Sequence, residues 1–241
     1  NAVNGDHPLE VYRFFRDETK AQFIQFIPVV ERDPHSSTVT PLSVSPEQYG
    51  KFLTGVFDEW VQHDVGTIYV QHFDTALANW YGEPHGICVF SPACGSAMVI
   101  EHNGDIYSCD HFVDQDHLLG NILTVPLTEL VNSERQRQFG RDKREKLPKY
   151  CQGCPVLFAC RGECPKNRFT LTPDGEPGLN YLCEGYRMFF SHIDRPMKFM
   201  VKELTENRPP SNVMTYMTGK KTGAASFHKP GGKDPSYRFR R

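Results

Sequence analysis

Residues 151–183 read CQGCPVLFACRGECPKNRFTLTPDGEPGLNYLC, and this stretch carries five of the eight cysteines of the chain. The first four are spaced C-x2-C-x5-C-x3-C, and the fifth follows after eighteen intervening residues. Thiols this dense in a sequence are expected to be cross-linked to one another or to hold a metal centre. The other three lie upstream, at Cys88, Cys94 and Cys109.

The spacing favours iron–sulfur clusters and leaves zinc open. Zinc ribbons use two C-x2-C pairs per site, whereas this chain has one such pair, Cys151 and Cys154. Four-iron clusters accept less regular spacing. A disulfide framework is less favoured, because such scaffolds are usually much shorter and lack a large apolar core. Spacing alone groups Cys151 to Cys164 as a single site.

Composition indicates an ordinary soluble globular protein, with 241 residues, 39% hydrophobic and 23% charged. The net charge of −2 conceals a basic end, since residues 219–241 hold seven Lys or Arg against one acid. We expect residues 209–241 to form a disordered basic tail, and nucleic acid is not expected as a partner. With no apolar run of membrane-spanning length and no signal peptide, the predicted location is cytoplasmic. The chain begins at Asn1 on a polar turn and a helix, so we expect a piece of a longer protein.

Residues 1–86 have the rhythm of a parallel α/β sheet, helix, strand, helix, strand, helix. The expected elements are a helix over 7–20, a strand over 22–30, a helix from Pro46, a strand over 67–71 and a helix over 74–81. Ser45 is the expected N-cap of the second helix, with Pro46 at its first position. There are too few strands to close a barrel, so we interpret this region as the last part of one.

From Cys88 on, the alternation of helices and strands gives way to a predicted hairpin followed by helices. Two strands, 97–101 and 105–109, flank His102-Asn103-Gly104, and Asn-Gly is a strong hairpin signal because both turn positions favour positive φ. Helices are expected over 127–132 and 134–145, and a long closing helix over 179–206 that Pro196 interrupts. From Pro209 on, no apolar period is present.

The cysteine pattern resembles the SPASM domain of radical SAM enzymes. Cys94-x9-Gly104-x4-Cys109, then C-x2-C-x5-C-x3-C, then Cys183 matches its seven cysteines and its glycine. Cys88 resembles the form with two complete auxiliary clusters. The phrases CGSAMVIEHNGDIYSCDHFV, GLNYLCEGY and FIQFIPVVER are similar to those of anaerobic sulfatase-maturating enzymes.

The resemblance implies a fold class: α/β, the C-terminal part of a partial (β/α) radical SAM barrel (1–86), followed by a SPASM domain (87–208), a β-hairpin plus helices around two clusters. It also implies two auxiliary [4Fe–4S] clusters with the ligand sets Cys88, Cys94, Cys109 and Cys164, and Cys151, Cys154, Cys160 and Cys183. The family's C-x3-C-x2-C motif, which holds a third [4Fe–4S] cluster and S-adenosylmethionine, is not in this sequence. We therefore expect the chain to be inactive by itself and assign the activity to a full-length parent.

In the family, a 5′-deoxyadenosyl radical takes a hydrogen atom from the β-carbon of a sulfatase Cys or Ser, which becomes formylglycine. The implied partners are a sulfatase polypeptide with a C-x-P-x-R motif and an electron donor such as flavodoxin or ferredoxin. By resemblance the general base is Asp110, and a nearby anionic cluster is expected to raise its pKa. His102, His111 and His117 are expected to lie at the surface or behind the ligands, and Arg161 and Lys166 are candidates to balance the cluster charge.

Two other functions stay open. One is a different peptide-modifying enzyme of the SPASM type, because this domain serves many substrates. The other is a non-catalytic interaction module stabilised by zinc.

Overall fold

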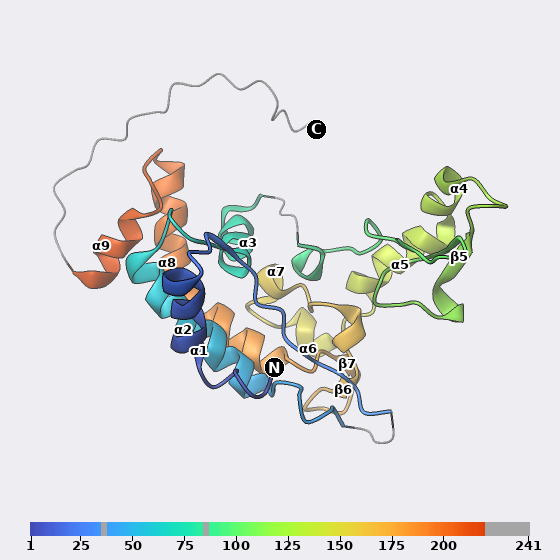
Figure 1. Cartoon of the computed structure of the whole chain (residues 1–241), viewed down its shortest axis with the longest axis horizontal. Helices are drawn as coiled ribbons and strands as arrows, with labels where there is room; N and C mark the ends of the chain where they lie inside the picture. The colour runs from blue at the N-terminus through green and yellow to red at the C-terminus, as the bar shows by residue number, and fades with distance from the viewer. Residues whose placement is uncertain (35–37, 84–86, 220–241) are drawn as a thin grey trace.

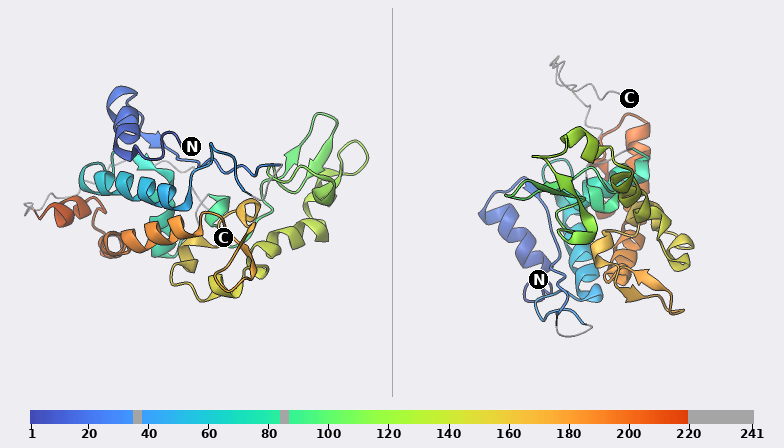
Figure 2. Two further views of the ribbon diagram at one scale, coloured as in Figure 1. Left: turned by 90° about the horizontal axis from the view of Figure 1, so that it is seen from below. Right: turned by 90° about the vertical axis from the view of Figure 1, so that its right-hand side faces the viewer.

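The computed structural model of the chain describes residues 1–34, 38–83 and 87–219. One end of the molecule is a helical block, containing α1 (Pro8–Arg13), β1 (Phe23–Ile24), α2 (Pro46–His63), β2 (Tyr69–Val70), α3 (Gln71–Tyr81), α8 (Cys183–Thr205) and α9 (Asn212–Thr218). The other end contains β3 (Val99–Ile100), β4 (Asp105–Tyr107), β5 (Leu118–Asn121), α4 (Leu127–Val131) and α5 (Glu134–Glu145). Between them lie α6 (Lys149–Gln152), α7 (Leu157–Cys160), β6 (Thr170–Leu171) and β7 (Pro177–Leu179), as Figures 1 and 2 show from three sides.

The two strands of the helical block pair in parallel, with Phe23 opposite Tyr69 and Ile24 opposite Val70. Ile24 and Val70 are buried, whereas Phe23 and Tyr69 are exposed and their rings stack, with centroids 5.2 Å apart. A parallel pair needs a crossover connection, and here α2 supplies it. The predicted helix–strand rhythm of residues 1–86 is confirmed, although both strands are shorter than expected.

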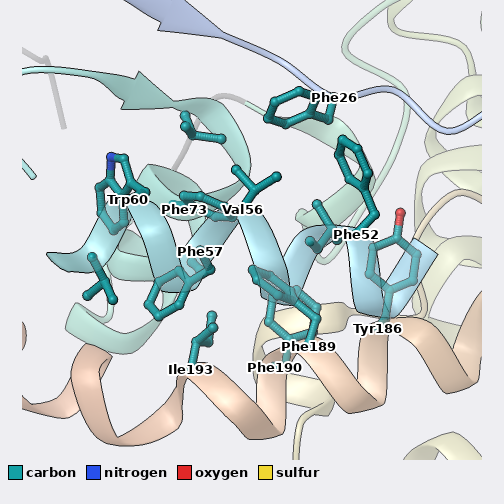
Figure 3. Packing of buried hydrophobic residues seen from close by; sticks show 14 of the residues in the cluster. Phe26, Phe52, Val56, Phe57, Trp60, Phe73, Tyr186, Phe189, Phe190 and Ile193 are labelled. Atoms are coloured by element: carbon teal, nitrogen blue, oxygen red, sulfur yellow. The ribbon is translucent and has the colours of Figure 1, made fainter. Parts of the chain in front are cut away.

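Helix α2 is the centre of the core. Ser45 caps it as predicted, its side chain accepting a hydrogen bond from the backbone N–H of Gln48. Its apolar face packs along α8, and Figure 3 shows Phe57 among Phe73, Phe189 and other aromatic side chains. The Phe57 ring meets Phe73 and Phe189 edge to face, with centroids 5.2 and 6.2 Å away. Aromatic pairs of this geometry add to the free energy gained by burial.

The crossing of α2 and α8 is made possible by two glycines. A Cβ on Gly185 would lie 2.2 Å from the carbonyl oxygen of Pro46, and one on Gly50 would lie 2.8 Å from the Cα of Gly185. We expect Gly185→Ala to lower the free energy of unfolding by about 1–3 kcal/mol, because the obstruction is backbone and cannot rotate away. Urea unfolding of the chain measures this. Gly153→Ala, where a Cβ meets nothing within 4 Å, is the control; equal midpoints for both variants contradict the packing described here.

Helix α8 differs from its prediction at both its start and its middle. It begins at Cys183 rather than near Leu179, because Leu179 ends β7. The expected interruption at Pro196 is wrong, since the helix continues to Thr205. Pro196 lacks the N–H for one helical hydrogen bond, but it is itself buried, and Ile193 and Met197 beside it are fully buried. Packing therefore holds the helix together across the proline.

The expectation of no regular structure from Pro209 is wrong for Asn212–Thr218, which form α9. This helix packs against α2 and α8 through Val213, which is fully buried. A seven-residue helix with one buried apolar anchor is too short for periodicity to reveal. The basic residues 220–241 lie outside the described residues, so the prediction of a disordered tail remains untested there.

The hairpin predicted around Asn103-Gly104 is present, as β3 and β4 pair antiparallel with Ile100 opposite Ile106. Gly104 has φ 89°, a conformation that glycine adopts at little cost. The sequence did not reveal a third strand, β5, which pairs with β4 and has only four residues. Helix α5 runs over the predicted residues and is capped by Ser133.

No helix in the described parts of the chain combines the length and the apolar character needed to cross a bilayer. The division at residues 86 and 208 remains a prediction.

Candidate functional site

The eight cysteines sit on segments that meet between the helical block and the small sheet. Three come from the region before α4: Cys88 opens a short 3-10 turn, Cys94 lies in a loop and Cys109 follows β4. Of the others, Cys151 lies in α6, Cys154 between α6 and α7, Cys160 at the end of α7, Cys164 in the loop after α7 and Cys183 at the start of α8. All eight are free thiols.

Electrostatic neighbours divide the thiols into two groups. In the first group, burial raises the pKa of Cys164 to about 12 and that of Cys109 to about 11. The nearby Cys94 contributes to raising both pKa values. Burial also raises the pKa of Cys94, on which Cys88 acts in the same direction. This first group is Cys88, Cys94, Cys109 and Cys164.

The second group is assembled in the same way. Burial raises the pKa of Cys183 to about 11, with further contributions from Cys151 and Cys154. It also raises the pKa of Cys160, on which Cys183 and Cys151 act. No thiol of one group is a main influence on a thiol of the other. Cys160 and Cys164, four residues apart, therefore have different neighbours.

Two gatherings of four thiols fit two centres that need soft ligands. Zinc or a four-iron cluster takes four thiolates. A metal must displace thiol protons to bind, because burial raises the pKa values of Cys94, Cys109, Cys151, Cys160, Cys164 and Cys183. Each group joins segments distant in sequence, so ligation would tie the hairpin, the loop after α7 and α8 together.

Asp110 follows Cys109 directly and is exposed. The Cys109 thiol donates a hydrogen bond to its Oδ1 at 3.1 Å, and this bond is the main cause that lowers the pKa of Asp110. A bonded donor favours the carboxylate, so the protonated thiol acts against a raised pKa. The raised pKa expected for Asp110 beside an anionic cluster stays a prediction. Asp110, Cys109 and His111 bring ligand atoms within 4.8 Å of one another.

A cavity of about 300 Å³ joins the two halves of the site. On one side lie residues that follow β1 and β2, including Gln25, Pro28 and His72. On the other lie Asp110 and the first thiol group, through Cys88 and Cys164. His111 also lines the cavity, with Nδ1 3.5 Å from the Cys164 sulfur. Asp110 thus faces the same space as the carboxyl ends of the parallel strands, where ligands of α/β sheets usually bind.

Two cationic residues that the sequence did not single out lie beside the thiols. Lys143 is 1% exposed and acts on Cys94, and Arg168 is among the main charges near Cys94 and Cys151. The expected charge-balancing residues are placed differently: Lys166 is exposed, and Arg161 has a buried Nε without a hydrogen-bond partner. One pattern in the sequence could have indicated that Lys143 is buried. It follows the buried residues Gln136 and Gly140 at helical spacing on α5.

Comparison with family models matches residues 88–155 to SPASM, described as an iron–sulfur cluster-binding domain. The fold and the site thus define the class: a SPASM domain joined to part of a radical SAM barrel.

The chain is 49% identical over 228 residues to a serine-type anaerobic sulfatase-maturating enzyme of Bacteroides thetaiotaomicron, covering 89% of this chain and 55% of that protein. A cysteine-type enzyme of Clostridium novyi is 29% identical, over 85% of this chain and 54% of its own length. The solved structure of native anSMEcpe with bound AdoMet and Cp18Cys peptide superposes with a TM-score of 0.73 at 26% identity, covering 84% of this chain and 56% of the other.

The chain belongs to the family of anaerobic sulfatase-maturating enzymes, radical SAM enzymes with a SPASM domain, and corresponds to a C-terminal portion of such a protein. It spans about half the length of the curated relatives just described. The fold class expected from the sequence is confirmed.

Proposed function

We propose that this chain forms the C-terminal half of an enzyme that oxidises a residue of a sulfatase to formylglycine, providing two auxiliary [4Fe–4S] clusters and the general base. The observation that carries the proposal is the cavity that Asp110 and Cys164 share with the residues after β1 and β2. A peptide in that cavity would lie between a carboxylate and a cluster on one side and the barrel on the other.

The proposed ligand sets are those that the resemblance implies. The division of the thiols into Cys88, Cys94, Cys109 and Cys164, and Cys151, Cys154, Cys160 and Cys183, supports them, because each set gathers its own neighbours. Iron is favoured over zinc because the SPASM family is described as iron–sulfur cluster-binding.

The reaction removes one hydrogen atom from the β-carbon, one proton from the hydroxyl or thiol, and one electron, so that CH2–XH becomes CH=X. With serine this product is formylglycine, whereas with cysteine it is a thioaldehyde that water hydrolyses to formylglycine with release of hydrogen sulfide. When bound, S-adenosylmethionine and the clusters supply the radical and take up the electron. Asp110 accepts the proton. A carboxylate can act as the base that this step requires, and the exposed side chain of Asp110 is free to reach a peptide.

We further propose that serine is the favoured substrate residue. The serine-type relative shares 49% of the aligned residues and the cysteine-type relative 29%. The substrate peptide bound in the solved neighbour supports a polypeptide substrate for this chain as well.

The test uses a full-length protein that joins this chain to a C-x3-C-x2-C segment. It is incubated without oxygen, with S-adenosylmethionine and a reductant, with a C-x-P-x-R peptide and with the same peptide carrying serine. Mass spectrometry is expected to show loss of two hydrogen atoms from the serine peptide, and faster conversion than of the cysteine peptide. No mass change in either peptide contradicts the proposed reaction, and faster cysteine conversion contradicts only the serine preference.

A further inference from the structure

Lys143 is a buried cation that backbone oxygens hold in place. Its Nζ donates hydrogen bonds to the backbone oxygens of Cys88 and Val89, the second at 2.8 Å. Among the described residues it makes no ion pair. Backbone oxygens satisfy the donors of the ammonium group, but they do not neutralise its charge.

Arg168, which is half-buried, is likewise held by backbone oxygens, one of them that of Lys143. Its guanidinium donates to four backbone oxygens: those of Gly162 at 2.9 Å, Lys143 at 2.6 Å, and Arg161 and Glu163 at 3.1 Å each. Across the described chain, no carboxylate forms an ion pair with it. Arg168 therefore links α5 to the loop after α7 while keeping an uncompensated charge.

Two adjacent cations, Lys143 buried and Arg168 half-buried, repel each other and lose hydration, so the fold needs negative charge nearby. The buried carboxyl nearest to them is Glu163, but its Oε2 accepts hydrogen bonds from Asn180 and Asn167, at 2.6 and 3.3 Å, and among the described residues it forms no ion pair with either cation. The thiols are the other acidic groups around the two cations. Cys94 and Cys88 are the ones that act on Lys143, and Cys151, Cys94 and Cys160 act on Arg168.

We propose that Lys143 and Arg168 are the counter-charges of the two clusters and raise their reduction potentials. Lys143 acts on the cluster held by the first thiol group alone, whereas Arg168 lies between the groups and acts on both. This inference rests on the proposed cluster binding. Both are positioning residues, which act on the electron acceptor and not on the substrate.

The physical basis is the charge that a cluster gains on reduction. A fixed positive charge in a poorly solvated region stabilises the more negative, reduced form, so the potential rises. A higher potential makes the first cluster a better acceptor for the electron that leaves the substrate. A buried charge is also screened less by salt than a surface charge.

The test measures potentials, which a purely structural role would leave unchanged. The whole chain is reconstituted with iron and sulfide without oxygen, and each cluster is titrated electrochemically with detection by electron paramagnetic resonance. Cys183→Ser isolates the first cluster and Cys109→Ser the second. The variants are Lys143→Met and Arg168→Met. The charge-conserving controls are Lys143→Arg and Arg168→Lys, and Lys146→Met is an exposed control on the helical turn after α5.

We expect Lys143→Met to lower the potential of the first cluster so that, at a fixed potential, its ratio of reduced to oxidised form falls about tenfold, or ~59 mV for one electron. The second cluster should stay unchanged in this variant, whereas Arg168→Met should lower both. The charge-conserving variants and Lys146→Met should keep the parent potentials.

Unchanged potentials in both Met variants, with full iron content, overturn the inference. If the Met variants take up no iron while the charge-conserving variants do, the positive charge is needed for the clusters to form, and this result supports the counter-charge role. If the charge-conserving variants also lose iron, the site depends on the shape of these two side chains and not on their charge, and the inference fails. A parent chain that binds no iron instead removes the proposed cluster binding itself.

Discussion

Cys164→Ala is expected to remove the cluster of the first thiol group and to leave the second cluster in place, although Cys164 lies in the same short run as Cys151, Cys154 and Cys160. The reason is that Cys94 and Cys109 are the thiols that act on Cys164, from segments far away in the sequence. Iron per chain should fall from about eight atoms to about four.

Double variants show which cluster is lost. Adding Cys109→Ala to Cys164→Ala should leave about four iron atoms, because both changes strike one cluster. Adding Cys183→Ala should leave about none, because the two changes strike different clusters. If Cys164→Ala combined with Cys151→Ala keeps about half the iron, the run 151–164 is a single site and the proposed ligand sets are wrong.

Asp110→Asn in a full-length enzyme is expected to slow formylglycine formation by about 10²–10⁴-fold, the range typical of a lost general base. The amide has nearly the same shape but accepts no proton at neutral pH. The measurement is single-turnover conversion of the serine peptide, with iron content checked in each preparation.

Asp116→Asn is the matched control for this variant. Asp116 is an exposed carboxylate on the same stretch of chain, and it lies outside the cavity that Asp110 lines. A rate for Asp110→Asn within a few-fold of both the parent and this control contradicts the role of Asp110 as the base.

Features that depend on local rules could be predicted from the sequence. Ser45-Pro46 starts α2 because serine caps helices, and the hairpin turns at Gly104 because glycine adopts a positive φ at little cost. The helix through Pro196 and the short helix α9 could not be predicted, since tertiary burial of Met197 and Val213 decides them.

The candidate site shows the same division. The eight cysteines were recognisable by type and spacing, but their grouping came from a resemblance and not from spacing. The pKa of Asp110 is lowered because the Cys109 thiol points at its Oδ1, 3.1 Å away. The orientation of that thiol could not be predicted from the sequence. Lys143 and Arg168 are sequence-distant residues that meet the thiols only in the fold.

The most direct test of cluster binding is the iron and acid-labile sulfide content of the chain, purified and reconstituted without oxygen. We expect about eight iron and eight sulfide per chain, with a brown colour from thiolate-to-iron charge transfer. Colourless protein that holds zinc and no sulfide would contradict this expectation and would favour the zinc-stabilised interaction module instead.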